Sequence, residues 1–535
     1  MATKIETVDI LVVGSGIAGC SAALAAARGG ASVAMITRET EPAETNTMYA
    51  QGGIIYRGDS DSPALLADDI SVAGAGFTSP SAAALLAVEG PRLVRELLVE
   101  QLHVPFDRVD GHLHLTAEAA HSVARIVHHK DMTGRAIQVS LLAAVRAEPR
   151  IRMLTRHTAV DLLTLSHHSQ NRLDVYEPPT CVGAYVLDQE SGWVTPLLAG
   201  EVILSTGGLG RLFLHTTNPA GSRGDGIAMA ARAGVRLINL QFVQFHPTAL
   251  YHHSGRFLLS EALRGEGARL IDSRGREFMR EMHPDGSLAP RDVVARGIHQ
   301  MMLDTGERCA FLDISHKDPA WVREHFPSIY ETCAGLGFDL TREPIPVVPA
   351  AHYSCGGVAV DSEGRSSMRR LRAVGEVSCT GVHGANRLAS TSLLEGLVWG
   401  TRAGEAAARG VRAEGTPYLP PIAPWRHEHE PVDPALILQD WLTIQQTMWN
   451  YVGLARSGKR LRRAQKILNE LHIEIEDFYR QGEMTDALVG LRNGLLAARA
   501  VLEAAIEARW SVGCHYRDDA PADVEASTAP EPQGR

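Results

Sequence analysis

The N-terminus carries the feature that most restricts the fold, a glycine-rich turn directly after an apolar run. Gly14, Gly16 and Gly19 have G-x-G-x-x-G spacing, and the six residues up to Gly14 are typical of a strand buried on both faces of a parallel sheet. A helix over 20–28 and a second strand over 32–37 are expected to follow. Such a unit points a helix N-terminus at the pyrophosphate of a dinucleotide. The chain is therefore predicted to begin with a Rossmann-like α/β domain.

The end of the second strand does not by itself identify the dinucleotide. An acid usually holds the ribose there, but this chain has Thr37 and Arg38, and its nearest acid is Glu39. Arg38 suits either the 2′-phosphate of NADP or the adenosine of FAD. The polar, glycine-ended loop 46–53 favours FAD, because NAD dehydrogenases have no reason to carry it.

Composition excludes several classes of protein. The 535 residues are 45% hydrophobic and 21% charged, which is ample for a large buried core. A net charge of −10 argues against nucleic-acid binding, which needs a basic face. Seven scattered cysteines without a C-x-x-C pair predict reduced thiols. No apolar run reaches the roughly 18–20 residues of a membrane span and no secretory signal is recognisable, so a cytosolic protein is expected.

The chain changes character twice after the first domain. Residues 241–353 are rich in His, Arg and Pro and predict an inserted α+β domain that caps the nucleotide-binding core. From 434 onward, apolar residues keep helical spacing and predict a C-terminal helical bundle. Strand signals at 201–208 and 371–376 belong to the Rossmann-like FAD-binding domain, and 166–180 is predicted to be an exposed loop. The expected boundaries are 1–240 and 354–425 (FAD-binding), 241–353 (capping), 430–517 (helical) and 518–535 (disordered tail).

Five motifs occur in order along the chain: 46–53, 260–267, 290–292, 351–357 and 384–393. Together they resemble the flavoprotein subunits of the succinate dehydrogenase/fumarate reductase family, and within it most closely the L-aspartate oxidase branch. The likeness extends over most of residues 8–517.

The resemblance implies an FAD site. Its expected residues are Gly14, Ser15, Gly16, Ile17, Ala18, Gly19, Arg38, Asn46, Thr47, Met48, Tyr49, Ala50, Gln51, Gly52, Gly53, Asp225, Glu376, Ser392 and Leu393. Glu376 is placed to bond the ribityl chain, and the helix that begins at Ser392 would stabilise negative charge on the reduced ring. For Asp225 an ordinary helix N-cap is the alternative. Respiratory members of the family have a flavin-linking histidine where this chain has Asn46, so the FAD is expected to be non-covalent.

The resemblance also implies a pocket for a four-carbon dicarboxylate. Its carboxylates would be held by His246, Ser260, His352 and Arg387, and an arginine fork matches a carboxylate with two parallel hydrogen bonds. Such a clamp fixes the substrate against the flavin, where hydride transfer demands close alignment. Taken singly, His246, which precedes a proline, could be an ordinary loop residue.

Arg291 resembles the arginine that carries protons in this family. Because the pKa of a guanidinium in water is high, this role requires a relay. Glu261 and Arg264 resemble the other members of that relay. The alternatives are a surface ion pair of Arg291 with Asp292, and a helix-surface pair of Glu261 with Arg264.

Glu118 separates the candidate reactions. It lies in a segment, 115–122, that resembles the aspartate oxidases. A carboxylate in a pocket for a dianion would repel succinate, but it pairs with the ammonium group of an amino acid. The alternatives are a helix N-terminal charge and a metal site with His121, for which no further ligand has suitable spacing.

These implications combine into one expected reaction. FAD would oxidise L-aspartate to iminoaspartate, with O2 (giving H2O2) or fumarate as the electron acceptor. This is the first step of de novo NAD biosynthesis, with iminoaspartate handed to quinolinate synthase. The alternatives are a soluble fumarate reductase or succinate dehydrogenase-like flavoprotein, and a flavin-binding protein without turnover.

Overall fold

The computed structural model describes residues 6–118, 120–253, 255, 257–415, 418–425 and 430–521. The N-terminal domain is built on a sheet of seven strands, with the order β8-β2-β1-β11-β10-β9 and β18 beside β11. Its strands are β1 (Glu6–Val13), β2 (Val33–Ile36), β8 (Ile151–Leu154), β9 (His157–Thr164), β10 (Cys181–Asp188), β11 (Val194–Leu204) and β18 (Leu371–Ala373). β1 pairs in parallel with β2 and β11, whereas β9 and β10 are antiparallel.

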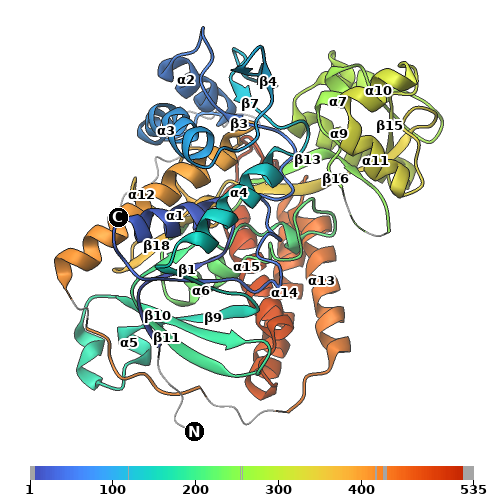
Figure 1. Ribbon diagram of the computed structural model, residues 1–535. Helices are drawn as coiled ribbons and strands as arrows, with labels where there is room; N and C mark the ends of the chain where they lie inside the picture. Colours follow the sequence, from blue (N-terminus) through green and yellow to red (C-terminus); the bar gives the residue numbers. More distant parts are fainter. Residues whose placement is uncertain are drawn as a thin grey trace.

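The predicted β-α-β unit is present. Helix α1 (Ile17–Arg28) connects β1 to β2 and begins three residues earlier than expected, because Gly16 is its N-cap. The long helix α12 (Thr391–Glu414) crosses α1 closely (Figure 1). Alanines along α1 and Gly400 and Gly404 on α12 allow this approach, since a side chain at either glycine would meet the α1 backbone.

Helices and small sheets surround this core. The three-stranded sheet β3-β7-β6 holds the loop that carries Glu118, and β12-β17-β19 lies beside α6. The elements are α2 (Pro63–Ala73), α3 (Pro80–Leu93), α4 (Thr133–Ala147), α6 (Asp225–Arg232), β3 (Ile54–Ile55), β4 (Arg108–Val109), β5 (His112–Leu113), β6 (Leu115–Thr116), β7 (Ile126–Val127), β12 (Leu237–Ile238), β17 (Gly357–Ala359) and β19 (Ser378–Cys379). Short or irregular helices span Val94–Gln101, Gly210–Leu212, Gly286–Leu288 and Gly375–Val377.

A separate lobe, green to yellow in Figure 1, is inserted between these parts. Its antiparallel sheet has the order β13-β16-β15-β14, and it has an apolar core of its own. The elements are β13 (Val243–Leu250), β14 (Arg269–Ile271), β15 (Ala310–Asp313), β16 (Ile345–Ser354), α7 (Ala262–Gly265), α8 (Met279–Met282), α9 (Arg291–Thr305), α10 (Pro319–His325) and α11 (Pro327–Gly335). Asp131 of the N-terminal domain accepts a hydrogen bond from the amide of Ser328 at 3.0 Å, which tethers the start of α11.

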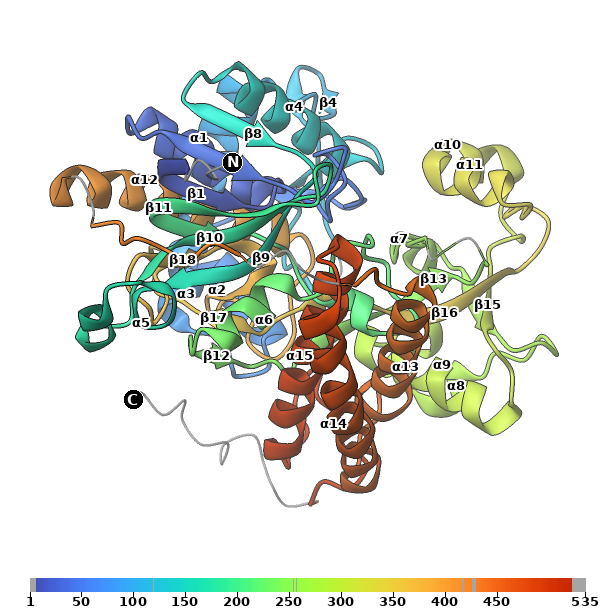
Figure 2. The ribbon, with the colours of Figure 1, turned by 90° about the horizontal axis from the view of Figure 1, so that it is seen from below.

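Three helices follow, α13 (Pro434–Val452), α14 (Gly458–Gln481) and α15 (Asp486–Glu507). Asp433, Ser457 and Thr485 cap their N-termini through side-chain oxygens, and Pro434 is the first residue of α13 as expected. In Figure 2 the three helices adjoin both the sheet and the inserted lobe. The α/β core, inserted α+β lobe and helical bundle confirm the predicted fold class.

The prediction of a loop over 166–180 was wrong. Residues Leu165–His168 form a short helix, α5, and Arg172–Tyr176 form a 3-10 turn. Asp174 organises this segment by accepting hydrogen bonds from Ser169 and Asn171, a local pattern that composition does not reveal. Of the predicted disordered tail 518–535, the first residues are ordered, since Asp519 accepts a hydrogen bond from the amide of Gly458 at 2.7 Å. Residues from 522 onward lie outside the described residues. Within the parts that the structure describes, no helix has the length and apolar character needed to cross a membrane.

Candidate functional site

One cavity of about 1160 Å³ lies at the carboxyl ends of β1, β2, β11 and β18, between the N-terminal domain and the inserted lobe. Ligands of open α/β sheets bind at this edge. The volume exceeds the roughly 300–1,000 Å³ of a pocket for one small molecule. Every predicted site residue lines the cavity except Gly19 and Met48. Gly19 packs against Gly14, in agreement with the packing role of the third glycine of the motif.

The α1 end of the cavity is suited to a pyrophosphate. Gly14 has φ +116°, a conformation that favours glycine, and it lies directly against Ser205. The N-terminus of α1 has no side-chain cap, and the amide of Ile17 donates to Thr47 Oγ1 at 3.1 Å. Free amides at a helix N-terminus are a site for anions.

Arg38 and Asp225 belong to one buried charge network with the C-terminal helices. Arg38 and Arg223 each contact Asp486 of α15 at 2.9 Å. Asp225 accepts hydrogen bonds from Arg223 at 3.0 Å and from Asn493 at 2.9 Å. Burial alone would raise the pKa of Asp486, but the two arginines lower it by more than burial raises it. The Asp486 carboxylate is therefore ionised. Asp225 is not an N-cap, because Gly224 occupies that position.

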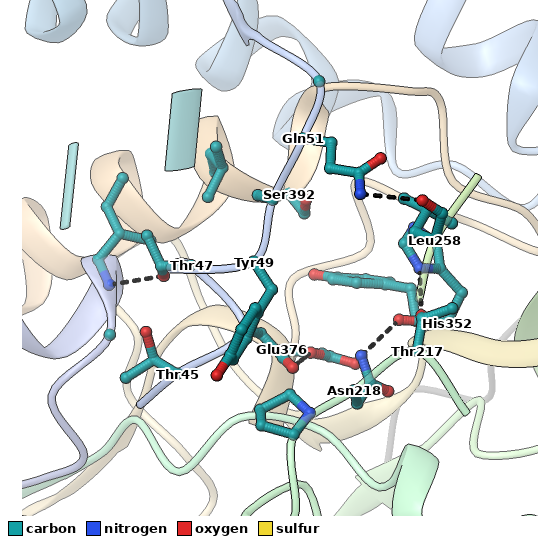
Figure 3. Close-up of a pocket in the computed structure, with 18 of the residues that line it drawn as sticks. Thr45, Thr47, Tyr49, Gln51, Thr217, Asn218, Leu258, His352, Glu376 and Ser392 are labelled. Carbon is teal, nitrogen blue, oxygen red and sulfur yellow. Dashed lines mark hydrogen bonds between the residues drawn. The ribbon is translucent and has the colours of Figure 1, made fainter. Parts of the chain in front are cut away.

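Glu376 lies at the centre of the cavity wall (Figure 3). Its carboxylate accepts hydrogen bonds from Asn46 Nδ2 at 2.7 Å and from the amide of Ser354 at 3.0 Å. Burial raises the pKa of Glu376 to about 7. The ionised side chain, which can accept hydrogen bonds from hydroxyl groups, is therefore held at a cost in stability.

This cost gives a pH-dependent prediction. Between about pH 4.5 and 7 the folded flavin-free protein binds a proton at Glu376 that the unfolded chain has released, so stability falls as pH rises. The difference between these pKa values corresponds to a loss of about 3 kcal/mol in the free energy of unfolding, and this loss is complete above pH 7. We expect flavin-free Glu376→Gln to resist urea better than the unsubstituted protein at about pH 8, and to bind FAD more weakly. The exposed Glu190→Gln is the control. Equal pH slopes for Glu376→Gln and the unsubstituted protein would contradict the assignment.

The other end of the cavity brings His246, His352 and Arg387 together. The two imidazole rings are 5.5 Å apart, and Arg387 lies 4.7 Å from the ring of Tyr353. Burial, reinforced by nearby arginines, holds the pKa of both histidines well below the usual range, so both are neutral. Arg387 Nε is buried without a hydrogen-bond partner among the described residues. A buried cation with an unused donor is suited to an anionic ligand.

Both histidines lie in β-strands. His246 lies within strand β13, so the alternative of an ordinary loop residue was wrong, and His352 lies within β16. Thr217 Oγ1 lies 2.9 Å from His352 Nδ1 and fixes the ring, as Figure 3 shows. Ser260 lines the same end of the cavity, just before α7.

Arg291, Glu261 and Arg264 form a continuous chain of ion pairs. Glu261 Oε2 contacts Arg291 Nε, and Glu261 Oε1 contacts Arg264 at 2.7 Å. Burial alone would raise the pKa of Glu261, but the two arginines together lower it. Arg264 is only 1% exposed, so the helix-surface alternative was wrong. Asp292 pairs with Arg296 instead of Arg291, which excludes the other alternative.

Glu118 lies in the loop between β6 and β7 and faces the cavity near Gly52. It is not at a helix N-terminus. His121 contacts the carbonyl of Ala389 at 3.1 Å. Within the described residues, no three His, Cys, Asp or Glu side chains come together as metal ligands.

Sequence reasoning missed several residues of the site. Tyr353 directly follows His352 in the motif 351–357, so its position in the sequence was a usable signal. Thr217, which lines the cavity, carries no local signal, because it meets His352 from a distant part of the chain. The same holds for Asp486 and Asn493 of α15, which support the cavity residues Arg38 and Asp225.

The glycine cradle, the uncapped helix and the volume fit FAD with a small acid beside it. The family model described as FAD binding domain matches residues 9–393, and that described as fumarate reductase flavoprotein C-term matches residues 441–528. Among solved structures, FrdA of Escherichia coli quinol fumarate reductase superposes with a TM-score of 0.84 at 26% identity, covering 96% of this chain and 92% of that one. Sdh1 of Mycobacterium smegmatis has a TM-score of 0.82 at 30% identity, covering 97% and 90%. The chain is a flavoprotein of the succinate dehydrogenase/fumarate reductase class.

Curated relatives define the branch. L-aspartate oxidase of Pseudomonas aeruginosa is 43% identical, with 96% of this chain and 95% of that protein covered. L-aspartate oxidase of Halobacterium salinarum is 44% identical, with 98% and 99% covered. The chain belongs to the L-aspartate oxidase family, as the ordered motifs predicted.

Proposed function

We propose that this protein uses FAD to oxidise L-aspartate to iminoaspartate. The single observation that carries the proposal is the position of Glu118, whose carboxylate lines the same cavity as Arg387, Arg291 and two neutral histidines and has no ion-pair partner among the described residues. A dianion alone gains nothing from that carboxylate. A substrate with two carboxylates and an ammonium group pairs with every charge. The curated relatives are named for this activity.

Arg387 would hold one substrate carboxylate through its fork, including the unused Nε, while the ring of Tyr353 supports the guanidinium. His246, His352 and Ser260 would donate to the remaining carboxylate oxygens. Because both imidazoles are neutral, each has one donor and one acceptor nitrogen. For His352, Thr217 occupies Nδ1 and leaves Nε2 for the substrate.

Arg291 would exchange a proton with the substrate, and Glu261 Oε2, which it contacts, would take part in the transfer toward Arg264. The buried Arg264 donates to the carbonyl of Ser287 at 2.8 Å, which fixes the inner end of this relay. Bound FAD would supply the two-electron acceptor. Gly14, Gly16 and the α1 N-terminus would hold its pyrophosphate, and Glu376 its ribityl hydroxyls.

Four finer points belong to the proposal. The FAD is non-covalent, since Asn46 has no nucleophilic ring nitrogen and its amide is bonded to Glu376. O2 and fumarate are the electron acceptors. Iminoaspartate passes to quinolinate synthase in NAD biosynthesis. The domain boundaries and cytosolic location expected from the sequence stay predictions.

A substrate panel on the purified flavoprotein tests this function. We expect H2O2 release with L-aspartate but not with D-aspartate or succinate, and free flavin in the supernatant after acid precipitation. Glu118→Gln is expected to lower kcat/KM for L-aspartate by about 30-fold or more, because removing one partner of a buried charge pair costs about 2–5 kcal/mol. Fumarate reduction by the reduced enzyme should change less than about threefold.

The same panel separates the alternatives. Equal losses of both activities in Glu118→Gln would favour a fumarate reductase-like flavoprotein. Absence of turnover with every substrate, in a protein that retains its flavin, would favour a binding protein.

A further inference from the structure

The turn before α12 contains a residue with an unexpected backbone. Ser390 has φ +58° and ψ +8°, the left-handed region that glycine adopts without strain. A non-glycine residue there costs on the order of 1 kcal/mol. Ser390 is also 9% exposed and lines the cavity. A strained, buried serine at this position suggests that its hydroxyl has a use.

That use is not helix capping. A serine at an N-cap normally accepts a hydrogen bond from the first turn of its helix, but Ser390 makes no such bond with α12. Its hydroxyl donates instead to Glu118 Oε2 at 2.8 Å. The hydrogen bond therefore joins two segments that are 272 residues apart in the sequence.

Two further features restrict the position of Glu118 and of the loop that carries it. Glu118 Oε1 lies so close to Gly52 that a Cβ at this glycine would be 2.8 Å from the oxygen. On the other side, His121 contacts the carbonyl of Ala389, the residue before Ser390, at 3.1 Å. The loop that carries Glu118 is thus held at two points against the turn that precedes α12. Ser390 supplies the point that reaches the carboxylate itself.

We infer that Ser390 is a positioning residue for substrate selection: it aims the Glu118 carboxylate at the amino group of an amino dicarboxylate. The inference rests on the proposed function, in which Glu118 recognises that group. A hydroxyl that donates to one carboxylate oxygen limits the rotation of that carboxylate. The other oxygen is then presented in one place. Ser390 thereby favours an aminated substrate over its deaminated analogue without itself taking part in hydride or proton transfer.

The experiment uses the flavin-loaded enzyme with Ser390→Ala and Ser390→Gly, each compared with Glu118→Gln. Loss of a hydrogen bond to a charged group is expected to raise KM for L-aspartate by on the order of tenfold in both serine variants. The kcat and the Kd of succinate, the latter from flavin absorbance, should change less than about threefold. Ser390→Gly relieves the left-handed strain, so a foldable variant is available even if Ser390→Ala is unstable.

The control and the double variant identify the route of the effect. Ser62→Ala removes an N-cap hydroxyl of α2 that does not line the cavity, and it should leave both KM and the Kd of succinate unchanged. In the combined variant, Ser390→Ala should add nothing to the KM increase of Glu118→Gln, because both act through one carboxylate. Additive increases, an equal weakening of succinate binding, or an unchanged KM in both serine variants would overturn the inference. If Glu118→Gln itself leaves KM and kcat/KM unchanged, the role proposed for Glu118 fails, independently of Ser390.

Discussion

Replacing Arg291 with methionine is expected to lower kcat for L-aspartate by about 10²- to 10⁴-fold, the usual contribution of a positioned proton-transfer group. The side chain reaches the cavity from the first turn of α9 and contacts Glu261, which continues to the buried Arg264. Removal of the guanidinium interrupts this chain at its substrate end. Steady-state oxidation and single-turnover flavin reduction measure the effect.

Arg291→Lys is the matched variant, since it keeps the charge but not the planar group that contacts Glu261. We expect it to remain at least tenfold below the unsubstituted enzyme. Flavin content should be unchanged in both variants, because Glu376 and the glycine turn are untouched. A kcat within threefold of the unsubstituted enzyme would exclude Arg291 from proton transfer.

Replacing Arg387 with methionine is the second large change, and it should act on binding. Arg387 is only 6% exposed, and its Nε has no hydrogen-bond partner among the described residues. Loss of a charged partner in such a site costs about 2–5 kcal/mol, or about 30-fold to several thousandfold in affinity. We expect the Kd of succinate to rise by this factor. A titration of the flavin absorbance measures it.

The two arginine variants differ in which quantity they change. Arg291→Met should lower kcat far more than it weakens succinate binding, whereas Arg387→Met should weaken binding at least as much as it lowers kcat. Arg387→Lys is the control for charge alone and should recover only part of the affinity. Tight succinate binding by Arg387→Met would show that the dicarboxylate lies elsewhere.

The fold was predictable where the signals are local. The run of apolar residues before Gly14 and the glycine spacing itself specify a buried strand, a tight turn and a helix, and these three are adjacent in both sequence and space. The caps of the C-terminal helices are equally local, since Asp433 and Ser457 each directly precede the helix that they cap. Residues 166–180 failed because their order depends on side-chain bonds to Asp174 that spacing does not display.

The candidate site was predictable only in part. The ordered motifs supplied the residues that line the cavity, and the structure brings His246, His352 and Arg387 to one end of it. It also excludes an N-cap role for Asp225. The supporting residues were missed, since Thr217 and Asp486 act through hydrogen bonds that join distant segments.

The sequence by itself determined the β-α-β start and the C-terminal helices, which follow from short-range periodicity and glycine spacing. Its ordered motifs, through their resemblance to a known family, also named the residues expected beside a flavin. Tertiary structure alone decided that Glu118 is held by Ser390, that Arg291, Glu261 and Arg264 form one chain of ion pairs, and that Asp486 of α15 pairs with the cavity residue Arg38. The physical reason is that a hydrogen bond or ion pair needs contact within a few ångströms. Only the folded chain brings residues hundreds of positions apart to that distance.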